Sequence, residues 1–322
     1  LMENVVLDVD AKSSESLVIR DDLELNKTLT LQAGGSFRPR VSLTNITEIN
    51  GRGFIQLLAP NEDAESRYQN ELYDVRFSDT NKELSEVLTF GEDLGIIGTG
   101  RISVESLLGK TDYLRILGPI TASKGVLEIE SLDNGEQPIT LSHADGGTVH
   151  FEDAVKNVQI ISDDGSISEV NPILFTGYVL MDNVVLDVEA KSSDNSIDIV
   201  DNFELNSTLS LVPETSFSNF NIIGSSVLAG TGTILLNRPD VTAKNQGARF
   251  SVRFEGISDL AETFTIPSEF EIRGTGRIET SFGFGENRDK INLLGTLVAD
   301  GGLLEIKSLD PVVGSLRATS DG

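Results

Sequence analysis

The chain has 322 residues, of which 39% are hydrophobic, and 51 Asp and Glu against 25 Lys and Arg give it a formal net charge of −26. This acidic balance argues against nucleic acids and anionic membrane surfaces as partners, because both require a basic face. The absence of cysteine excludes disulfides and Cys-ligated metal sites.

The first predicted strands lie in a segment that occurs twice. LMENVVLDVDAKSS at residues 1–14 matches LMDNVVLDVEAKSS at residues 180–193, with only Asp and Glu exchanged. The match continues to GVLEIESLD at residues 125–133 and GLLEIKSLD at residues 302–310. We therefore predict two tandem modules: residues 1–179 form the first repeat, and residues 180–322 form a second, incomplete one within a longer array.

Apolar and polar residues alternate with a period of two along both modules, which predicts short, half-buried strands with one face turned inward. The clearest examples are Val5–Val9, Leu29–Leu31, Leu127–Ile129 and Leu304–Ile306. Two segments, Glu71–Phe90 and Ile257–Thr265, come nearest to the 3.6-residue period of a helix, without a convincing match over a dozen residues. We expect loops or a single helical turn there.

A shorter period is set by glycines. Gly-x-Gly motifs begin at Gly51 and Gly98, 47 residues apart, and Gly125 follows Gly98 by 27 residues. Gly230 and Gly274 are 44 residues apart. We expect one turn of the chain, or rung, to take about 22–27 residues, so that 44–47 residues correspond to two rungs. Gly-Thr-Gly before an inward Ile is typical of a tight corner between strands.

The segments LAGTGTILLN at residues 228–237 and LLGTLVADGGLLEIKSL at residues 293–309 resemble rungs of the β-helix passenger and shaft regions of large bacterial surface proteins, the autotransporter and filamentous-haemagglutinin-like adhesins. The resemblance implies an all-β, right-handed parallel β-solenoid at the cell surface. It implies a fibre, stalk or adhesin shaft without catalysis. The expected partners are copies of the chain itself, joined head to tail or laterally, and surface glycans or other cell-surface proteins.

Two other interpretations remain open. A carbohydrate-active β-helix, such as a polysaccharide lyase, a hydrolase or a phage tailspike, would need clustered carboxylates with Arg or Lys on one face. Tandem β-sandwich adhesin domains would also consist of short strands with frequent turns. No stretch approaches the roughly 20 apolar residues of a membrane helix, so we expect no membrane insertion.

No catalytic residue is predicted. Asp8 and Asp10 recur as Asp187 and Glu189 and alternate with apolar residues, which indicates a solvated outer face of a strand. The two histidines, at positions 143 and 150, are expected at the surface. Calcium is the one cofactor considered, because hard cations prefer carboxylate-rich turns. The candidate ligands lie in two acidic turns and are Glu62, Asp63, Asp163 and Asp164.

Overall fold

The computed structural model describes residues 2–14, 16–32, 40–44, 46–58, 74–77, 87–104, 112–163, 165–169, 171–193, 196–213, 218–224, 226–238, 250–256, 262–280, 289–307 and 314–319. These residues form strands and turns, and none of them lies in a helix. Among them, therefore, no helix is long and apolar enough to cross a membrane. The all-β prediction is confirmed.

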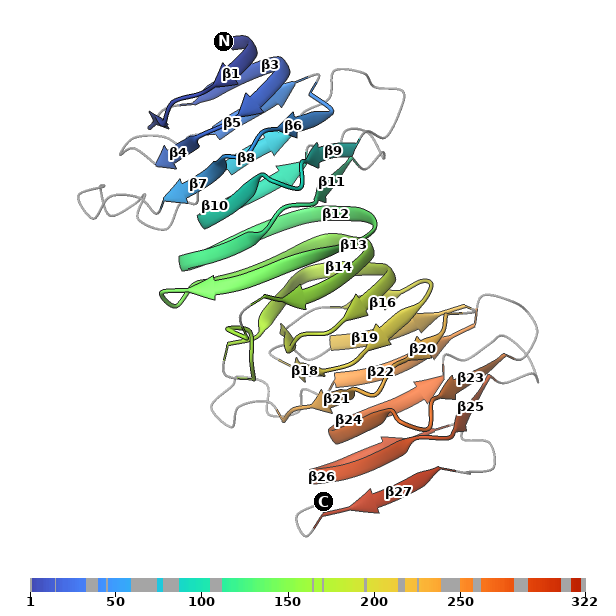
Figure 1. Cartoon of the computed structure of the whole chain (residues 1–322). Coiled ribbons are helices and arrows are strands. Elements are labelled where there is room, and N and C mark those ends of the chain that lie inside the picture. Colours follow the sequence, from blue (N-terminus) through green and yellow to red (C-terminus); the bar gives the residue numbers. More distant parts are fainter. Residues whose placement is uncertain are drawn as a thin grey trace. The chain divides into compact units, whose positions relative to one another are not determined.

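The chain divides into two compact units, Leu1–Ile167 and Ser168–Gly322 (Figure 1). The strands of unit 1 are β1 (Met2–Leu7), β2 (Ala11–Ser13), β3 (Leu17–Leu25), β4 (Thr28–Gln32), β5 (Arg40–Thr44), β6 (Glu48–Asn50), β7 (Phe54–Leu58), β8 (Asp74–Phe77), β9 (Val87–Phe90), β10 (Gly95–Val104), β11 (Tyr113–Ile116), β12 (Ile120–Ala144) and β13 (Thr148–Ser162). The strands of unit 2 are β14 (Ile173–Leu186), β15 (Ala190–Ser193), β16 (Ile197–Ile199), β17 (Phe203–Leu205), β18 (Thr208–Val212), β19 (Ser218–Ile223), β20 (Leu228–Ala229), β21 (Thr233–Leu236), β22 (Phe250–Glu255), β23 (Thr263–Ile266), β24 (Glu271–Thr280), β25 (Lys290–Leu293), β26 (Thr296–Ile306) and β27 (Ser315–Ala318).

The strands of unit 1 form three series of parallel pairs, which we call ladders A, B and C. Ladder A joins β2, β4, β7 and the first parts of β10 and β12. Ladder B joins the start of β1 to β3, β5, β8, the end of β10, the middle of β12 and β13. Ladder C joins the end of β1 to β3, β6, β9, β11 and β12. Successive strands along the chain therefore belong to successive ladders.

Unit 2 repeats the pairings of ladders A and B. Its ladder A runs from β14 through β15, β18, β21 and β24 to β26 and β27. Its ladder B runs from β14 through β16, β19, β22 and β24 to β26. Its ladder C is divided: β14, β17 and β20 pair in sequence, while β23 pairs only with β25 in a separate two-stranded sheet.

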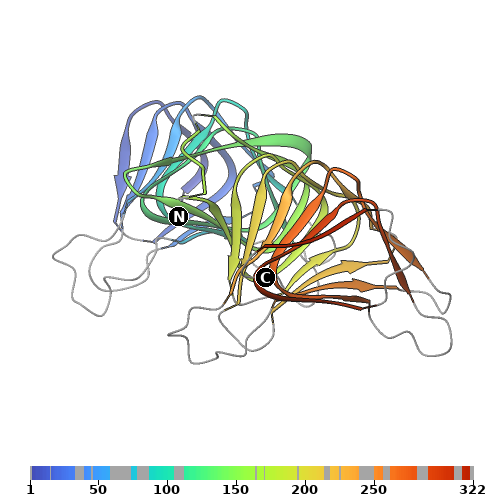
Figure 2. The same cartoon turned by 90° about the horizontal axis from the view of Figure 1, so that it is seen from below.

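Parallel pairing decides between the predicted fold classes. Immunoglobulin-like sandwiches consist of antiparallel sheets, whereas the ladders of the described strands in both units are parallel and the single antiparallel contact, Ser168 with Asn171, is an isolated bridge. The alternative of tandem β-sandwich domains is therefore wrong. Figure 2 shows how the strands of each unit turn from one face to the next around an interior.

Apolar side chains from partner positions stack in the interior of each unit. In ladder B of unit 2, five consecutive partners are fully buried: Val179, Ile197, Phe220, Val252 and Ile278. Burial of each such side chain contributes about 1.5–3 kcal/mol. The alternation predicted at Leu29–Leu31 and Leu127–Ile129 is confirmed, since the apolar residue at each end of both segments is buried. Val9, by contrast, is 68% exposed.

The predicted Gly-Thr-Gly corners are confirmed. Gly98 has a φ of 123° and Gly274 a φ of 121°, and at both the strand register shifts as the chain passes from ladder A to ladder B. A Cβ added at Gly98 would lie 1.8 Å from the carbonyl oxygen of Leu57, and one at Gly274 would lie 2.0 Å from that of Leu236. Both the backbone angle and the stacking of neighbouring strands therefore require glycine.

The predicted rung length is confirmed in part. Val126 pairs with Thr148, a rung of 22 residues (from 126 to 148). The expectation that 44–47 residues correspond to two rungs is wrong: Ile55 pairs directly with Ile96, so one rung spans 41 residues there (from 55 to 96). The extra length lies in the connections between strands, since β7 ends at Leu58 and β8 begins 16 residues later at position 74.

The described parts of the two segments expected to be loops or a helical turn contain strands, while residues 71–73, 78–86 and 257–261 lie outside the described residues. Within residues 71–90 the chain forms β8 and β9, and residues 263–266 form β23. In β9, Leu88 and Phe90 are buried with Thr89 between them, so the period is two. A four-residue strand holds too few inward positions for its alternation to stand out from neighbouring apolar residues.

Candidate functional site

Charged side chains gather on the outward positions of ladder B in both units. In unit 1, Arg101 on β10 lies beside Glu128 on β12, its register partner, with Nε and Oε1 2.9 Å apart. Arg101 also forms an ion pair with Glu130 and approaches Glu152 on β13 at 3.8 Å. Three carboxylates from two strands thus converge on one guanidinium.

Among the described residues of unit 1, these three carboxylates come nearest to the arrangement that a metal ion requires. One oxygen from each of Glu128, Glu130 and Glu152 lies within 4.8 Å of the others. Glu130 is only 7% exposed, so its charge requires a nearby cation. Arg101 supplies that charge and contacts all three groups. Arg101 therefore takes the place that a metal ion would have among these carboxylates, and the four side chains form an ion-pair network.

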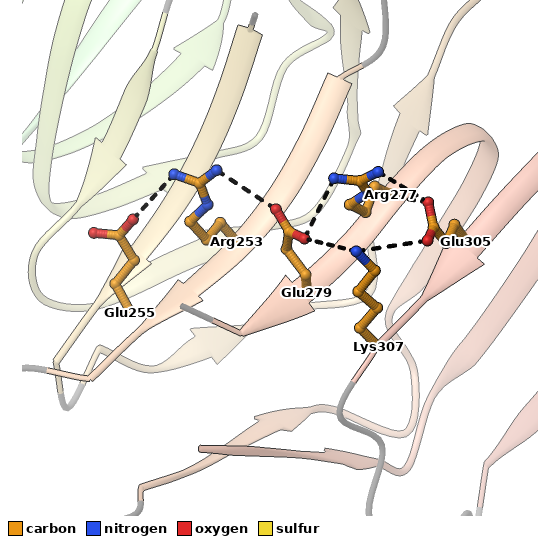
Figure 3. A network of polar contacts seen from close by, with 6 residues as sticks. All are labelled: Arg253, Glu255, Arg277, Glu279, Glu305 and Lys307. Atoms are coloured by element: carbon orange, nitrogen blue, oxygen red, sulfur yellow. Dashed lines mark hydrogen bonds and ion pairs between the residues drawn. The ribbon is translucent and has the colours of Figure 1, made fainter. Parts of the chain in front are cut away.

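The corresponding network of unit 2 is longer and contains more cations (Figure 3). Glu279 lies at its centre, with Arg253 Nη2 at 3.5 Å, Arg277 Nη1 at 3.6 Å and Lys307 Nζ at 3.8 Å. Glu305 accepts from Arg277 at 3.1 Å and faces Lys307 at 3.6 Å. The hydrogen bond from Arg277, and then the charges of Arg277 and Lys307, hold the pKa of Glu305 below its usual value.

The two networks occupy equivalent positions but differ in charge. Arg101 corresponds to Arg277 in the GTGRI segments, and Glu130 of LEIESLD corresponds to Lys307 of LEIKSLD. Glu279, at the centre of the network in unit 2, corresponds to Ser103 in unit 1. Both networks therefore lie at the same place on the fold, but the charges of the side chains that form them differ.

Sequence reasoning missed both networks because they depend on register. Glu128 and Glu130 stand two residues apart in GVLEIESLD, which places them on one side of a strand. Arg101 lies 27 residues before Glu128 and becomes its neighbour because Gly100 pairs with Leu127 after the register shift at Gly98. The spacing of 27 residues between Gly98 and Gly125 is the same, but it was not applied to the charged residues.

The repeated acidic residues of the first segment bind polar groups of the next rung. Asp8 accepts a hydrogen bond from Nδ2 of Asn26 at 2.8 Å, and Asp10 accepts from the backbone N–H of Thr28 at 3.0 Å. Both aspartates are exposed. Their equivalents in unit 2, Asp187 and Glu189, accept from Asn206 at 2.8 Å and from Ser207 at 2.7 Å. These carboxylates join adjacent rungs.

His143 does not lie at the surface as expected, whereas His150 is partly exposed. His143 is 7% exposed, and its Nε2 accepts from the backbone N–H of Val149 at 3.3 Å. Burial, and then the charge of His143, lowers the pKa of His150 to about 4. The prediction for His143 was wrong because its side chain reaches across the turn before β13 to the N–H of Val149. The period-two pattern does not reveal such a contact.

Of the four calcium candidates, Asp163 is the one among the described residues. It is exposed, and its backbone N–H donates to the carbonyl oxygen of Leu141 at 3.3 Å. It takes no part in the carboxylate cluster around Arg101. Glu62, Asp63 and Asp164 lie outside the described residues, so calcium binding at these turns stays a prediction.

Comparison with known proteins gives no match. No protein-family model, no curated protein and no solved structure is similar to the chain.

Proposed function

We propose that the chain is a segment of a right-handed parallel β-solenoid that serves as the shaft of a fibre, stalk or adhesin outside the cell. Connections between parallel strands of one sheet are right-handed in about 98% of cases, which supports the handedness. The role proposed is mechanical: rungs about 4.8 Å apart convert chain length into reach.

One observation carries this proposal. The pairings of ladders A and B in unit 1 recur in unit 2 with the same strand order and with matched corners at Gly98 and Gly274. A binding or catalytic head needs one unique site, whereas a shaft gains length from each added copy. The exchange of Glu130 for Lys307 at matched positions also fits a shaft, since it leaves the ladders intact.

Length measurement tests the shaft. We expect chains with two, four and eight tandem copies of residues 1–179 to give particles in negative-stain electron microscopy whose length rises by a constant increment per copy. Constant width across the series is also expected. Flexibly linked beads, or a length that does not rise with copy number, would contradict the proposal. Sedimentation velocity over a range of concentrations tests the head-to-tail or lateral assembly that we propose, and a single species at all concentrations would exclude it.

A carbohydrate-active β-helix is the second candidate, favoured by the carboxylate cluster of Glu128, Glu130 and Glu152, which includes a position, Glu130, that unit 2 fills with Lys307. An enzyme of this kind would cleave a polysaccharide, and the Glu130→Gln, Glu152→Gln double variant would abolish that cleavage. Because Arg101 already holds these carboxylates, the geometry favours the shaft.

A further inference from the structure

A groove opens in unit 2 where ladder C is divided. Residues 226–228 at β20 form one wall and residues 262–265 at β23 form the other, with Pro267 and Leu294 at the rim. Its volume is about 710 Å³, within the range of sites that hold a small ligand or a short peptide. Both walls are strand edges, and no ladder joins β20 to β23 among the described residues.

The equivalent place in unit 1 is closed. There β6 pairs with β9: Glu48 is the partner of Thr89, and Ile49 is the partner of Phe90. The N–H of Thr89 donates to the carbonyl oxygen of Thr47 at 2.9 Å, and the N–H of Gly91 donates to that of Ile49 at 3.0 Å. These bonds fill the place that the groove occupies in unit 2.

Pro267 explains the difference. It corresponds to Gly91, because each accepts the same turn hydrogen bond: Leu94 N–H to Gly91 at 3.0 Å and Phe270 N–H to Pro267 at 3.1 Å. Proline has no N–H, so it cannot donate to Leu228, the equivalent of Ile49. One of the two ladder bonds that close unit 1 is therefore impossible in unit 2.

The lining of the groove is also more apolar than the equivalent place in unit 1. Val227 stands where unit 1 has Glu48 and is 53% exposed, and Leu294, which also lines the groove, is 40% exposed. Two exposed apolar side chains at an open strand edge form a surface that favours a partner over solvent. Glu262 adds one carboxylate, and Asp289 fixes its position by accepting from the Glu262 N–H at 2.9 Å.

We propose that this groove binds an extended peptide segment of a partner protein, which adds as a strand to the edges of β20 and β23. The peptide backbone pairs with the main-chain groups of Leu228 and Thr265, its apolar side chains cover Val227 and Leu294, and a Lys or Arg reaches Glu262. A sugar is disfavoured because the aromatic lining residue, Phe264, is 5% exposed and packs against Phe254 at 5.3 Å between ring centroids. The inference is independent of the proposed shaft.

The test uses the full chain and a fluorescein-labelled hexapeptide of alternating Val and Thr with one Lys, with binding followed by fluorescence anisotropy. We expect saturable binding that weakens at least tenfold in the Val227→Glu, Pro267→Gly variant, because both changes restore the residues with which unit 1 closes this place. Glu262→Gln should weaken binding severalfold. The matched control, Glu48→Val in unit 1, should leave the affinity unchanged.

Hydrogen exchange provides the second measurement. In the free protein the amides of Leu228 and Thr265 should exchange faster than those of their equivalents Ile49 and Thr89, and the peptide should slow them. Several results would overturn the proposal: no binding of the hexapeptide, equal affinity for the closed variant, or equal affinity for the same peptide with N-methylated backbone amides. Binding of a glucose hexasaccharide at the groove in place of the peptide would also overturn it.

Discussion

Single glycines fix where each rung turns. Gly98 and Gly274 combine a φ near +120° with a backbone carbonyl in the place of a side chain. Asn4 and Asn183 occupy another pair of equivalent corners, with φ of 51° and 56°, values that asparagine tolerates better than most residues. The same corner chemistry thus recurs in both modules, which explains why these residues recur in the sequence.

Replacement of Gly98 by Ala tests this at one corner. We expect the free energy of unfolding to fall by about 2 kcal/mol or more, because the residue is strained and its Cβ clashes with the Leu57 carbonyl. Gly146→Ala is the matched control, since Gly146 also has a positive φ, of 77°, but no atom within 4 Å of an added Cβ. Urea denaturation measures both. Equal effects would show that close stacking at Gly98 contributes nothing.

His150 makes a small pH dependence measurable. Its pKa is lowered from 6.5 to about 4 in the folded protein, so the unfolded state takes up a proton first as the pH falls. The stability that neutral His150 contributes is therefore complete above pH 6.5 and is lost progressively between pH 6.5 and about 4. We expect the melting temperature of His150→Gln to fall less over this interval than that of the wild type. Parallel curves would contradict the assignment.

At the scale of elements, ladder B is stabilised on its outer side by the Glu279 network of unit 2. Glu279 is 8% exposed and faces three cations. We expect Glu279→Ala to lower the free energy of unfolding by about 2 kcal/mol, because it leaves the three cations facing one another. Glu255→Ala, which removes a single contact with Arg253 at 3.5 Å, should cost less than about 1 kcal/mol. Thermal denaturation without added chemical denaturant, at low and at high salt concentration, measures the loss of stability in both variants.

The elements also show how much the sequence could predict. The period-two alternation identified strands at Leu29–Leu31 and Leu127–Ile129, and the Gly-Thr-Gly motif identified corners, because both depend on local backbone geometry. Register is not local. The ion pairs of Arg101 and the groove beside Pro267 depend on which residue 26–41 positions away becomes a neighbour, and the lengths of the loops together with the register shifts at the corners decide that.

At the scale of the whole molecule, the sequence repeat predicts the repeated ladders, of which A and B match from β1 to β12 in unit 1 and from the end of β14 to β27 in unit 2, while ladder C is divided in unit 2. The predicted module boundary, between residues 179 and 180, lies within β14. Insertions of different length in individual rungs obscured the shorter period, since connections between strands tolerate added residues at little cost.

Engineered disulfides test the central claim, parallel rungs repeated in both modules, most directly, because the chain has no cysteine of its own. Cysteines at Gln56 and Ile97, and at the matched pair Leu235 and Arg273, occupy register partners. Partners on adjacent strands are close enough for a disulfide. We expect both pairs to cross-link under mild oxidation, while Gln56 with Arg101, four residues out of register, does not. Cross-linking of the out-of-register pair, or failure of both register pairs in a folded protein, would contradict the account.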